Sequence, residues 1–530
     1  MTARTGGQAL VEGLVAHGVE TVFGIPGTHN LAVYAALAEH RVAHVLPRHE
    51  QGAGYAADGY ARSTGRVGVA LTTTGPAILN AAAAAAQAYS DSVPVLFISP
   101  GMPSQHPAHG NGLLHEIIDQ SAAMAAVLGT SLRVTSVAEI PLAVQQAFAV
   151  MTTGRPRPVH LEIPLDLLDE VAEVAPVLPA RPGTLHPDQA ALDRAVARID
   201  AAETVAIVAG GGTFAAATEL AAVAELLGAG VLTTANGKGA LPTGHPLFVG
   251  AGLQHAAARE LCEAVDVVLA LGTEFAPSDW WGGLPELAGK VVRIDVDATA
   301  ISTNVVPDVA LVADAAAALA ALADRVQRKE PSALVPTART AHRAQAREEG
   351  AAWIELVDAL ADVVPRDAII AADNAMAAYY GALSNLPLDR PHSFLYPTGA
   401  GTLGYGLPAG IGAKVANPET AVVVLHGDGG LMFSVAELAT AAELGLALPI
   451  VVVDNGGYGE IRNEMDDRDE PIHAVALGSP DFVMLAQSLG CLGVRAQSAA
   501  EVAAAVDKAF HADRPTLIHV RERSRATGEA

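Results

Sequence analysis

The chain has 530 residues, of which 51% are hydrophobic and only 4% are aromatic, and its formal net charge is −25. Its length suits about three domains, and its composition is that of a folded protein with large cores rather than a disordered chain. The negative charge argues against nucleic acid or an anionic membrane surface as a partner.

The N-terminal residues and the cysteines indicate a cytoplasmic protein. Glu12 and His17 lie where a signal peptide would be apolar. No apolar run reaches the ~20 residues of a membrane span. The two cysteines, Cys262 and Cys491, are far apart and have no metal-ligand spacing. We therefore expect buried cysteines in a reducing compartment.

Short apolar runs rich in β-branched residues alternate with Ala-rich stretches along the whole chain. Such runs between helices are typical of parallel sheets that are covered by helices on both faces, so we predict the α/β class. The predicted strands lie, in chain order, in residues 66–73, 93–99, 204–210, 265–272, 290–296, 367–373, 420–427 and 448–455.

Two stretches are predicted to link domains. Residues 173–189 contain four prolines, and residues 325–350 are charged and show no regular apolar pattern. Divisions at these stretches give three domains of similar size, over residues 1–175, 190–325 and 350–530. No internal repeat is evident in the letters.

The stretch from Gly427 to Gly459 places a small oxygen-bearing side chain after each of two predicted strands. Asp428 follows the first strand, and Asn455 lies 27 positions later, after "SVAELATAAELG", which predicts a helix. Ligands of open parallel sheets bind beyond the carboxyl ends of the strands. A carboxylate, an amide oxygen and the carbonyl of Gly457 would suit Mg²⁺. Two ordinary turns, one Gly-rich and one Asn-Gly, are the alternative.

The same spacing resembles the thiamine-diphosphate motif, and further stretches extend the likeness. Residues 47–65, 72–81, 88–101, 157–167 and 399–414 are similar, in order, to acetohydroxyacid synthase and its 2-oxo-acid decarboxylase relatives. The resemblance implies thiamine diphosphate and Mg²⁺ as cofactors. It also implies a pyrimidine-binding domain, a Rossmann-like middle domain and a diphosphate-binding domain, with the thiamine-diphosphate-binding fold occurring twice. A homodimer is the expected minimum, and a homotetramer is the expected assembly.

The resemblance assigns cofactor contacts to particular residues. Glu50 would contact the aminopyrimidine ring and activate the cofactor, reaching it from the other subunit. Leu403 would lie under the cofactor and keep it bent, and the carbonyl of Gly401 would accept from its amino group. The diphosphate would lie against Gly427, Gly429 and Gly430, where backbone can approach it closely. Asn374 and Tyr458 complete the implied cofactor site. A helix-face glutamate and a core leucine are the alternatives for Glu50 and Leu403.

Other residues are expected near the substrate. Thr28 and His29 lie in the family's substrate-facing loop, "GIPGTHN", and Thr73 is a further candidate. His115 and Glu116 lie where the synthases carry a stretch near the active site. A solvated turn and a helix-start histidine are the alternatives for the two histidines.

Several departures from the synthases bear on the reaction. Gly101 stands where they carry Gln, and Glu460, Ile461 and Glu464 stand where they carry Met, Val and Trp. Glu460 and Glu464 are four apart, hence on one helix face, and would suit a cationic substrate tail. A solvated helix face is the alternative. The flavin-contacting segments of the synthases are not reproduced, so FAD is not expected.

Together these stretches resemble most the 5-guanidino-2-oxopentanoate decarboxylase branch. We expect a non-oxidative decarboxylase of a 2-oxo acid. An acetolactate-forming carboligase is the first alternative, and a non-catalytic cofactor-binding homologue is the second. A nicotinamide dehydrogenase built on Gly399, Gly401 and Gly404 is the third, although the residues before this G-x-G-x-x-G are a poor strand.

Overall fold

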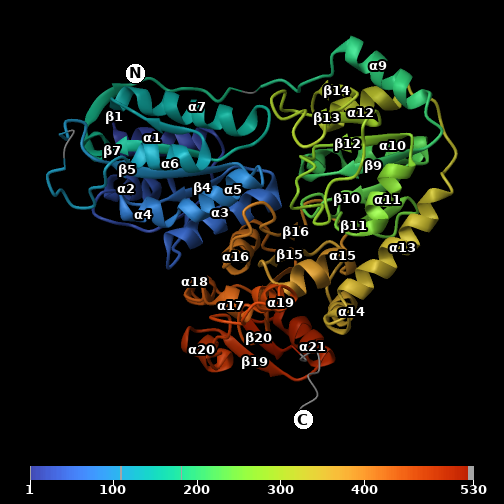
Figure 1. Ribbon diagram of the computed structural model, residues 1–530. Helices are drawn as coiled ribbons and strands as arrows, with labels where there is room; N and C mark the ends of the chain where they lie inside the picture. The colour runs from blue at the N-terminus through green and yellow to red at the C-terminus, as the bar shows by residue number, and fades with distance from the viewer. Residues whose placement is uncertain (1, 108–109, 181, 523–530) are drawn as a thin grey trace. The chain divides into compact units, whose positions relative to one another are not determined.

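The computed structural model describes residues 2–107, 110–180 and 182–522. Within these residues the strands form three six-stranded sheets, all parallel, and one antiparallel pair, with helices beside the sheets (Figure 1). The predicted α/β class is confirmed. Contacts divide the chain into two compact units. Unit 1 comprises Met1–Pro182, Ala400–Pro418 and Ser434–Leu446, and unit 2 comprises Gly183–Gly399, Glu419–Phe433 and Ala447–Ala530.

The sheet of unit 1 has the strand order β3-β2-β4-β5-β7-β6. Its strands are β2 (Thr21–Gly24), β3 (Ala43–Val45), β4 (Gly68–Leu71), β5 (Val95–Gly101), β6 (Ser131–Arg133) and β7 (Val159–Pro164). The antiparallel pair is β1 (Thr2–Thr5) with β8 (Val171–Val174). The helices are α1 (Gly6–Ala16), α2 (Leu31–His40), α3 (Glu50–Thr64), α4 (Pro76–Asn80), α5 (Ala82–Ser90), α6 (Gln120–Leu128), α7 (Ile140–Thr152), α8 (Leu165–Asp169), α16 (Gly406–Ala416) and α18 (Glu437–Glu443).

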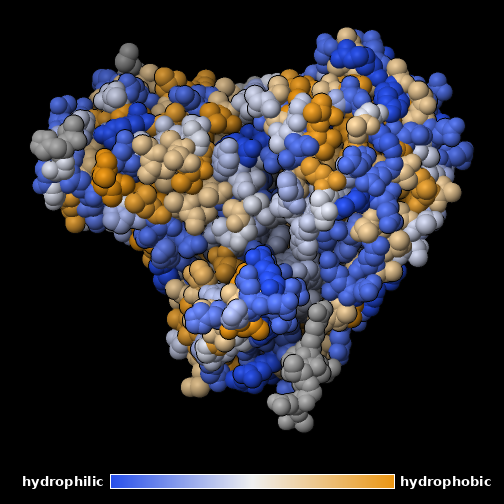
Figure 2. All heavy atoms as spheres, viewed as in Figure 1, coloured by the Kyte–Doolittle hydropathy of each residue, from blue (hydrophilic) through white to orange (hydrophobic). Residues whose placement is uncertain are grey.

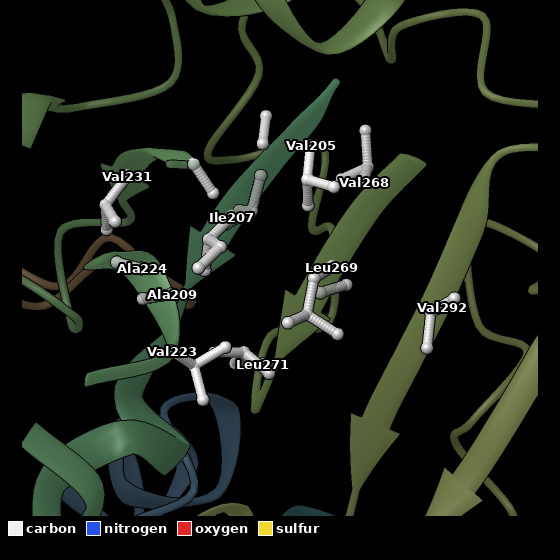
Figure 3. Close-up of a cluster of buried hydrophobic side chains, with 14 of the residues drawn as sticks. Val205, Ile207, Ala209, Val223, Ala224, Val231, Val268, Leu269, Leu271 and Val292 are labelled. Atoms are coloured by element: carbon white, nitrogen blue, oxygen red, sulfur yellow. The ribbon is translucent and has the colours of Figure 1, made fainter. Parts of the chain in front are cut away.

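The middle sheet, in unit 2, has the order β11-β10-β9-β12-β13-β14, which is the doubly wound order of a Rossmann fold. Its strands are β9 (Val205–Ala209), β10 (Gly230–Thr233), β11 (Phe248–Ala251), β12 (Val267–Leu271), β13 (Val291–Asp295) and β14 (Val309–Val312). Its helices are α9 (Gln189–Asp200), α10 (Ala217–Leu227), α11 (Ala256–Ala264) and α12 (Ala315–Ala323). Figure 3 shows how Ile207 and Leu269 of neighbouring strands join one buried cluster.

The third sheet, also in unit 2, has the order β16-β15-β17-β18-β20-β19. In chain order this is the arrangement of the unit 1 sheet, so the predicted double occurrence of one fold agrees with the topology. The strands are β15 (Ile369–Ala372), β16 (Phe394–Leu395), β17 (Val422–Gly427), β18 (Pro449–Asp454), β19 (Leu492–Ala496) and β20 (Thr516–Arg521). The helices are α14 (Ile354–Val363), α15 (Leu383–Asn385), α17 (Asp428–Leu431), α19 (Gly459–Asp467), α20 (Phe482–Ser488) and α21 (Ala499–Ala509).

Each of the eight predicted strands coincides with a strand of a parallel sheet. The stretch 325–350, predicted to link two domains, is mostly helical, because helix α13 spans Leu334–Glu349. Its buried residues are Val335, Ala338, His342 and Ala346. They recur at helical spacing, but they are few and lie among charged residues, so the pattern is hard to recognise in the sequence. Its many Ala, Arg, Gln and Glu residues are good helix formers.

Neither the helices nor the cysteines point to a membrane or a disulfide. Every helix in the described ranges is too short or too polar to cross a bilayer. Cys262 and Cys491 are buried thiols, as predicted, and burial raises the pKa of each to about 12.

Unit 1 is completed by two helices from the C-terminal part of the chain. Helix α16 packs on α3 with backbone against backbone: a Cβ on Gly59 would overlap the Ala409 carbonyl, and one on Gly412 would overlap the Ala56 carbonyl. Such close approach is open only to glycine. The helix that begins at Glu50 is therefore fixed against residues that lie some 350 positions later in the chain.

A buried ionic network reinforces this packing. Arg62 of α3 donates to Asp58 at 2.8 Å and to Asp91 at 2.5 Å, and the Tyr405 hydroxyl donates to Asp58 at 2.6 Å. Gln87 donates to Asp91 at 2.6 Å and accepts from the Thr402 hydroxyl at 3.0 Å. The network ties α3 to the stretch that holds Gly401 and Leu403.

Replacing Arg62 by Met should destabilise unit 1 by about 3–5 kcal/mol, because two carboxylates would stay buried without their cation. Urea unfolding followed by circular dichroism measures this. Arg66→Met is the matched control, since Arg66 pairs with Glu20 in solvent and such pairs contribute less than about 1 kcal/mol. Equal losses in both variants would show that the buried network contributes no special stability.

Candidate active site

The carboxyl ends of three neighbouring strands of the third sheet carry polar side chains. Asp373 follows β15, Asp428 follows β17, and Asn455 follows β18. The Asn455 N–H donates to Asp428 Oδ1 at 3.3 Å, so the two strand ends singled out in the sequence lie together. β15 and β17 flank the point where the strand order reverses, which is where open α/β sheets bind ligands.

The turn that begins at Asp428 is closely packed. A Cβ on Gly430 would overlap the Asp373 carboxylate, and one on Gly429 would lie 3.1 Å from the Tyr458 ring and 3.4 Å from the Gly457 carbonyl oxygen. The ring of Tyr458 and the carbonyl of Gly457 therefore face this turn. Glycine at 429 and 430 therefore leaves room for these protein groups, and the approach of a diphosphate to this backbone stays a prediction.

The loop after β18 is held in one shape by its own backbone. Gly457 has a φ of 139°, and a Cβ there would overlap the Val475 carbonyl. Tyr458 N–H donates to that carbonyl at 2.9 Å, and Leu477 N–H donates to the Gly456 carbonyl at 3.0 Å. The position of the Gly457 carbonyl is thus set by pairing with residues 475–477.

The oxygens at these two loops fit a hard divalent cation. Asn455 Oδ1 is buried and accepts no hydrogen bond. Asp428 is 3% exposed, and burial, aided by nearby Asp454, raises its pKa. A bound cation would give Asn455 Oδ1 a partner and would stabilise the negative charge of Asp428, with the Gly457 carbonyl as a third donor. The described residues offer no cluster of three or more His, Cys, Asp or Glu as a rival metal site.

Asp454 stabilises the loop after β18 through hydrogen bonds. Its Oδ2 accepts from His519 Nε2 at 2.9 Å, and its Oδ1 accepts from the Gly456 N–H at 3.0 Å and the Ser479 hydroxyl at 3.1 Å. Burial alone would raise the pKa of Asp454, but these donors outweigh it and lower that pKa. An ionised Asp454 thus orients Gly456, next to the proposed ligands.

Asp373 and Asn374 close the other side of the site. Asp373 is fully buried, with its Oδ2 3.2 Å from His426 Nδ1. The Tyr396 hydroxyl donates to Asn374 Oδ1 at 2.7 Å. The half-buried Asn374 lies at the same sheet edge as Asp428, where the resemblance expects a cofactor contact.

A carboxylate among aromatic rings lies directly after the loop. Tyr380 donates to Glu460 Oε1 at 2.7 Å, and burial together with the same carboxylate raises the pKa of the neighbouring Tyr379. Within the described residues, the buried Glu460 Oε2 has no partner of ordinary hydrogen-bond geometry. Trp281 and Trp353 contact the Tyr380 ring at centroid distances of 5.5 and 5.8 Å. Burial, together with the bond to Glu460, raises the pKa of Tyr380, so Tyr380 stays a neutral donor.

The other two residues predicted for this helix face solvent. Ile461 is 46% exposed, and the exposed Glu464 lies 3.4 Å from Arg468 in an i, i+4 pair. Figure 2 shows hydrophilic residues gathered over α19. Of the two glutamates predicted to meet a cationic tail, only Glu460 has an unsatisfied buried oxygen.

In unit 1 the corresponding sheet edge carries the predicted substrate residues. Thr28 and His29 follow β2, and Thr73 follows β4, its neighbour at the reversal of strand order. His29 Nδ1 lies 2.9 Å from the Thr74 hydroxyl, and the rings of His29 and His115 meet at 5.2 Å. Burial and the neighbouring His115 lower the pKa of His29, so this histidine is neutral near pH 7.

His115 and Glu116 play different parts in their loop. His115 has a φ of 64°, a conformation that costs a non-glycine residue energy, and its Nδ1 is buried without a hydrogen-bond partner. Glu116 instead accepts from the N–H groups of Asn111 and Gly112, which lowers its pKa. Glu116 thus shapes the loop, while His115 presents a free ring nitrogen.

Glu50 is the first residue of α3 and is half-buried, and Oε2 accepts from the Asn80 amide at 2.9 Å. Gly401 has a φ of 60°, and Leu403, also half-buried, lies between Thr402 and Tyr405, which are held by Gln87 and Asp58. The described part of unit 1 therefore holds Glu50 and Leu403 in defined positions.

Sequence reasoning missed Trp281, Tyr380, Asp454 and Glu437. Asp454 directly precedes Asn455 at the end of the predicted strand, and this position was a usable signal. Trp281 and Tyr380 lie about 100 positions apart, so their contact has no local signature. Glu437 was seen only as part of a helix.

Comparisons with known proteins agree with this geometry. The N-terminal TPP binding domain of thiamine pyrophosphate enzymes matches residues 4–123, the central domain matches residues 192–322, and the C-terminal TPP binding domain matches residues 376–520. Thiamine pyrophosphate is another name for thiamine diphosphate.

Relatives match over nearly the whole chain. A probable 2-ketoarginine decarboxylase of Pseudomonas aeruginosa is 41% identical, over 98% of this chain and 94% of its own. A probable acetolactate synthase large subunit of Methanocaldococcus jannaschii is 32% identical, over 97% and 91%. The acetolactate synthase isozyme 2 large subunit of Escherichia coli is 32% identical, over 97% and 95%.

The resemblance read from the sequence is thereby confirmed, and the sheet edge around Asp428 and Asn455 lies within the matched C-terminal domain. The chain belongs to the thiamine pyrophosphate enzyme family and is a thiamine-diphosphate-dependent enzyme.

Proposed function

We propose that this enzyme is a Mg²⁺-dependent, non-oxidative decarboxylase of 5-guanidino-2-oxopentanoate. The observation that carries the proposal is the Glu460 carboxylate, held by Tyr380 beside Trp281 and set five positions after Asn455. A further support is the relative named for 2-ketoarginine, which is the same compound.

The residues at the third sheet would hold the cofactor. Asp428, Asn455 and the Gly457 carbonyl would bind Mg²⁺, with the diphosphate at Gly427, Gly429 and Gly430 and with Asn374 and Tyr458 beside it. When bound, thiamine diphosphate supplies a carbon that adds to the keto group and accepts the electron pair left when carbon dioxide departs. Asp454 would keep the metal loop in place through Gly456.

Glu50 would hold the proton that it shares with a pyrimidine ring nitrogen. Asn80 leaves one oxygen of Glu50 available, because its amide engages only Oε2. A half-buried carboxyl suits this task, since it can exchange a proton with a neutral ring. Leu403 would support the cofactor from below, and the Gly401 carbonyl would accept from its amino group.

Thr28, His29, Thr73 and His115 would face the reacting end of the substrate. A neutral His29 can accept a hydrogen bond or a proton, and the free Nδ1 of His115 lies on the adjoining ring. Two neighbouring imidazoles can pass a proton to the carbon left after carbon dioxide departs, which releases an aldehyde. Glu116 would contribute by shaping the loop that presents His115.

The cationic tail would meet Glu460. A guanidinium presents a planar set of N–H donors that matches a carboxylate and stacks on aromatic rings. Glu460 offers the unsatisfied Oε2, and Trp281 offers an indole that is 46% exposed. Ile461 and Glu464 would lie further out, where solvent screens the charge of Glu464.

An acetolactate-forming carboligase is the alternative, because two of the relatives are acetolactate synthase large subunits. One observation disfavours it. A Cβ on Gly101 would overlap the Glu162 carboxylate, so the Gln that the synthases carry at this point has no room here. Glu162 is fixed by Ser121 at 2.6 Å and by Arg133.

We also propose that FAD is not a cofactor. The glycine turn after β9 is covered by protein: a Cβ on Gly212 would lie 2.8 Å from Gly272 Cα, and His392 Nε2 lies 3.0 Å from the Gly211 carbonyl oxygen. Phe214 packs on the same His392 at 4.1 Å. These contacts occupy the switch point of the middle sheet.

The proposed assembly is at least a homodimer and by expectation a homotetramer, with Glu50 of one chain serving the cofactor bound at Asp428 of another. The proposed domains are residues 1–175, 190–325 and 350–530, and the proposed compartment is the cytoplasm. Neither nucleic acid nor membrane is a proposed partner, in keeping with the net charge of −25.

The proposed reaction predicts carbon dioxide and 4-guanidinobutanal from 5-guanidino-2-oxopentanoate. The protein should be incubated with thiamine diphosphate and Mg²⁺, supplied with this substrate or with pyruvate, and assayed for carbon dioxide and the carbon product. Acetolactate from pyruvate, with little guanidino aldehyde, would establish the carboligase instead.

Asp428→Asn should weaken Mg²⁺ binding at least tenfold, because a neutral amide replaces the only carboxylate among the proposed donors. Calorimetric titration of Mg²⁺ in the presence of thiamine diphosphate measures the change. Asp367→Asn is the control, since the exposed Asp367 lies just before β15, at the amino ends of the strands and away from the carboxyl ends that carry Asp428. Unchanged Mg²⁺ affinity in the Asp428 variant would remove Asp428 from the metal site.

Glu460→Gln should lower kcat/KM for 5-guanidino-2-oxopentanoate about 10- to 100-fold, since a hydrogen bond to a charged group contributes about 1.5–3 kcal/mol. 2-Oxohexanoate, whose tail carries no charge, should be turned over as before or better. Steady-state kinetics with both substrates separates charge recognition from general damage. Asp466→Asn, an exposed carboxylate on the same helix, is the control. Equal losses on both substrates would contradict the assignment.

A further inference from the structure

Glu437 is a buried carboxylate that no step of the proposed reaction uses. It is 1% exposed and begins helix α18 in unit 1. Its Oε1 accepts from the backbone N–H groups of Arg48 at 2.9 Å and His49 at 3.0 Å, and its Oε2 accepts from the Thr440 hydroxyl at 2.6 Å. Both oxygens of this side chain are therefore engaged, and two of their three donors lie immediately before Glu50.

The contact lies at the N-terminus of α3. The N–H groups at the start of a helix have no partner within the helix, and the helix dipole makes this end attractive to an anion. His49 is the N-cap residue, and its ring accepts only from Gln51 N–H. Glu437 thus satisfies the two N–H groups that precede the helix, from another element.

Gly52 makes room for this carboxylate. A Cβ on Gly52 would overlap Glu437 Oε1 and would lie 2.8 Å from its Cδ. The side chain of Glu437 therefore fills the space above the first turn of α3, where any larger residue would displace it. Alanine at this position would favour the helix more than glycine does. The contact with Glu437 explains why glycine stands here in spite of its lower helix propensity.

We infer that Glu437 is the positioning residue for Glu50: by accepting the N–H groups of Arg48 and His49, it fixes the backbone from which the activating carboxylate projects. The inference rests on the proposed role of Glu50. The carboxylate acts through hydrogen bonds, and a glutamine can accept the same two N–H groups and donate to Thr440, whereas an alanine can do neither.

The first test needs no cofactor. Hydrogen–deuterium exchange of the apoprotein, read on peptides that cover residues 46–52, reports the amides of Arg48 and His49. Glu437→Ala should raise their exchange at least tenfold, and Glu437→Gln should keep them protected. Glu443→Gln is the matched control, because Glu443 is 58% exposed on the same helix and binds only the Arg48 side chain. Unchanged exchange in Glu437→Ala would overturn the inference.

The second test measures activation itself, as the rate at which bound thiamine diphosphate exchanges its C2 hydrogen with D₂O. Glu437→Ala should slow this exchange at least tenfold at saturating cofactor, and Glu437→Gln should stay within about threefold of the parent. Protected amides in Glu437→Gln combined with slow C2 exchange would overturn the inference, because charge rather than position would then matter.

A variant that leaves Glu437 chemically intact gives an independent check. Gly52→Ala should displace the carboxylate and so slow C2 exchange, although alanine favours the helix. In the double variant Gly52→Ala with Glu437→Ala, the second substitution should add little, since the two changes disturb one contact. Fully additive losses would mean that Gly52 and Glu437 act separately, which contradicts the inference.

Glu50→Gln separates this inference from the proposed function. If Glu50→Gln leaves C2 exchange unchanged, the role of Glu50 is wrong, and a positioning role for Glu437 falls with it. If Glu50→Gln slows C2 exchange and Glu437→Ala does not, only the inference about Glu437 fails.

Discussion

The register between β17 and β18 is the constraint on which the candidate site depends. Gly427 pairs with Val453, so Asp428 and Asn455 leave their strands at the same edge, one hydrogen-bonded to the other. A shift of one residue would turn every side chain of a strand to the other face of the sheet. The apolar runs of both strands are buried, and burying them fixes the register. The hydrophobic core thereby decides where the oxygen donors lie.

Buried polar groups hold the loops near the candidate site in position. Asp454 with His519 steadies the loop after β18, and the Asp58, Arg62 and Asp91 network fastens the stretch around Leu403 to α3. Each buried charge in these networks has a partner, which is what makes burial of a charge tolerable. Among the buried oxygens of the described residues that accept no hydrogen bond, two, Asn455 Oδ1 and Glu460 Oε2, lie where a ligand is proposed.

Much of this organisation could be predicted from the sequence, because continuous apolar runs report strands that are buried on both faces. All eight predicted strands exist, and the pairing of Asp428 with Asn455 follows from strand ends alone. Strands such as Ala43–Val45 and Phe394–Leu395 are too short to stand out from their surroundings. Helix α13 was hidden by charges that outnumber its four buried residues.

What could not be predicted depends on contacts between distant segments. Nothing in the letters around Glu437 says that its carboxylate ends at Arg48, and nothing near Trp281 says that it reaches Tyr380. The two related sheets share one strand order but no evident sequence repeat. This is expected where only topology and a few strand ends are under physical constraint, since many apolar residues can fill the same core.

The mixed origin of unit 1 has a consequence for synthesis on the ribosome. Helix α3 needs α16 against its glycine face, yet residues 400–418 follow the first 182 residues only after the whole middle sheet has been made. At about 5–20 residues per second this delay is on the order of 10 to 40 seconds. During that time the face formed by Ala56 and Gly59 has no covering helix from its own chain. The order of synthesis therefore leaves this face of α3 without its native cover until residues 400–418 have been made.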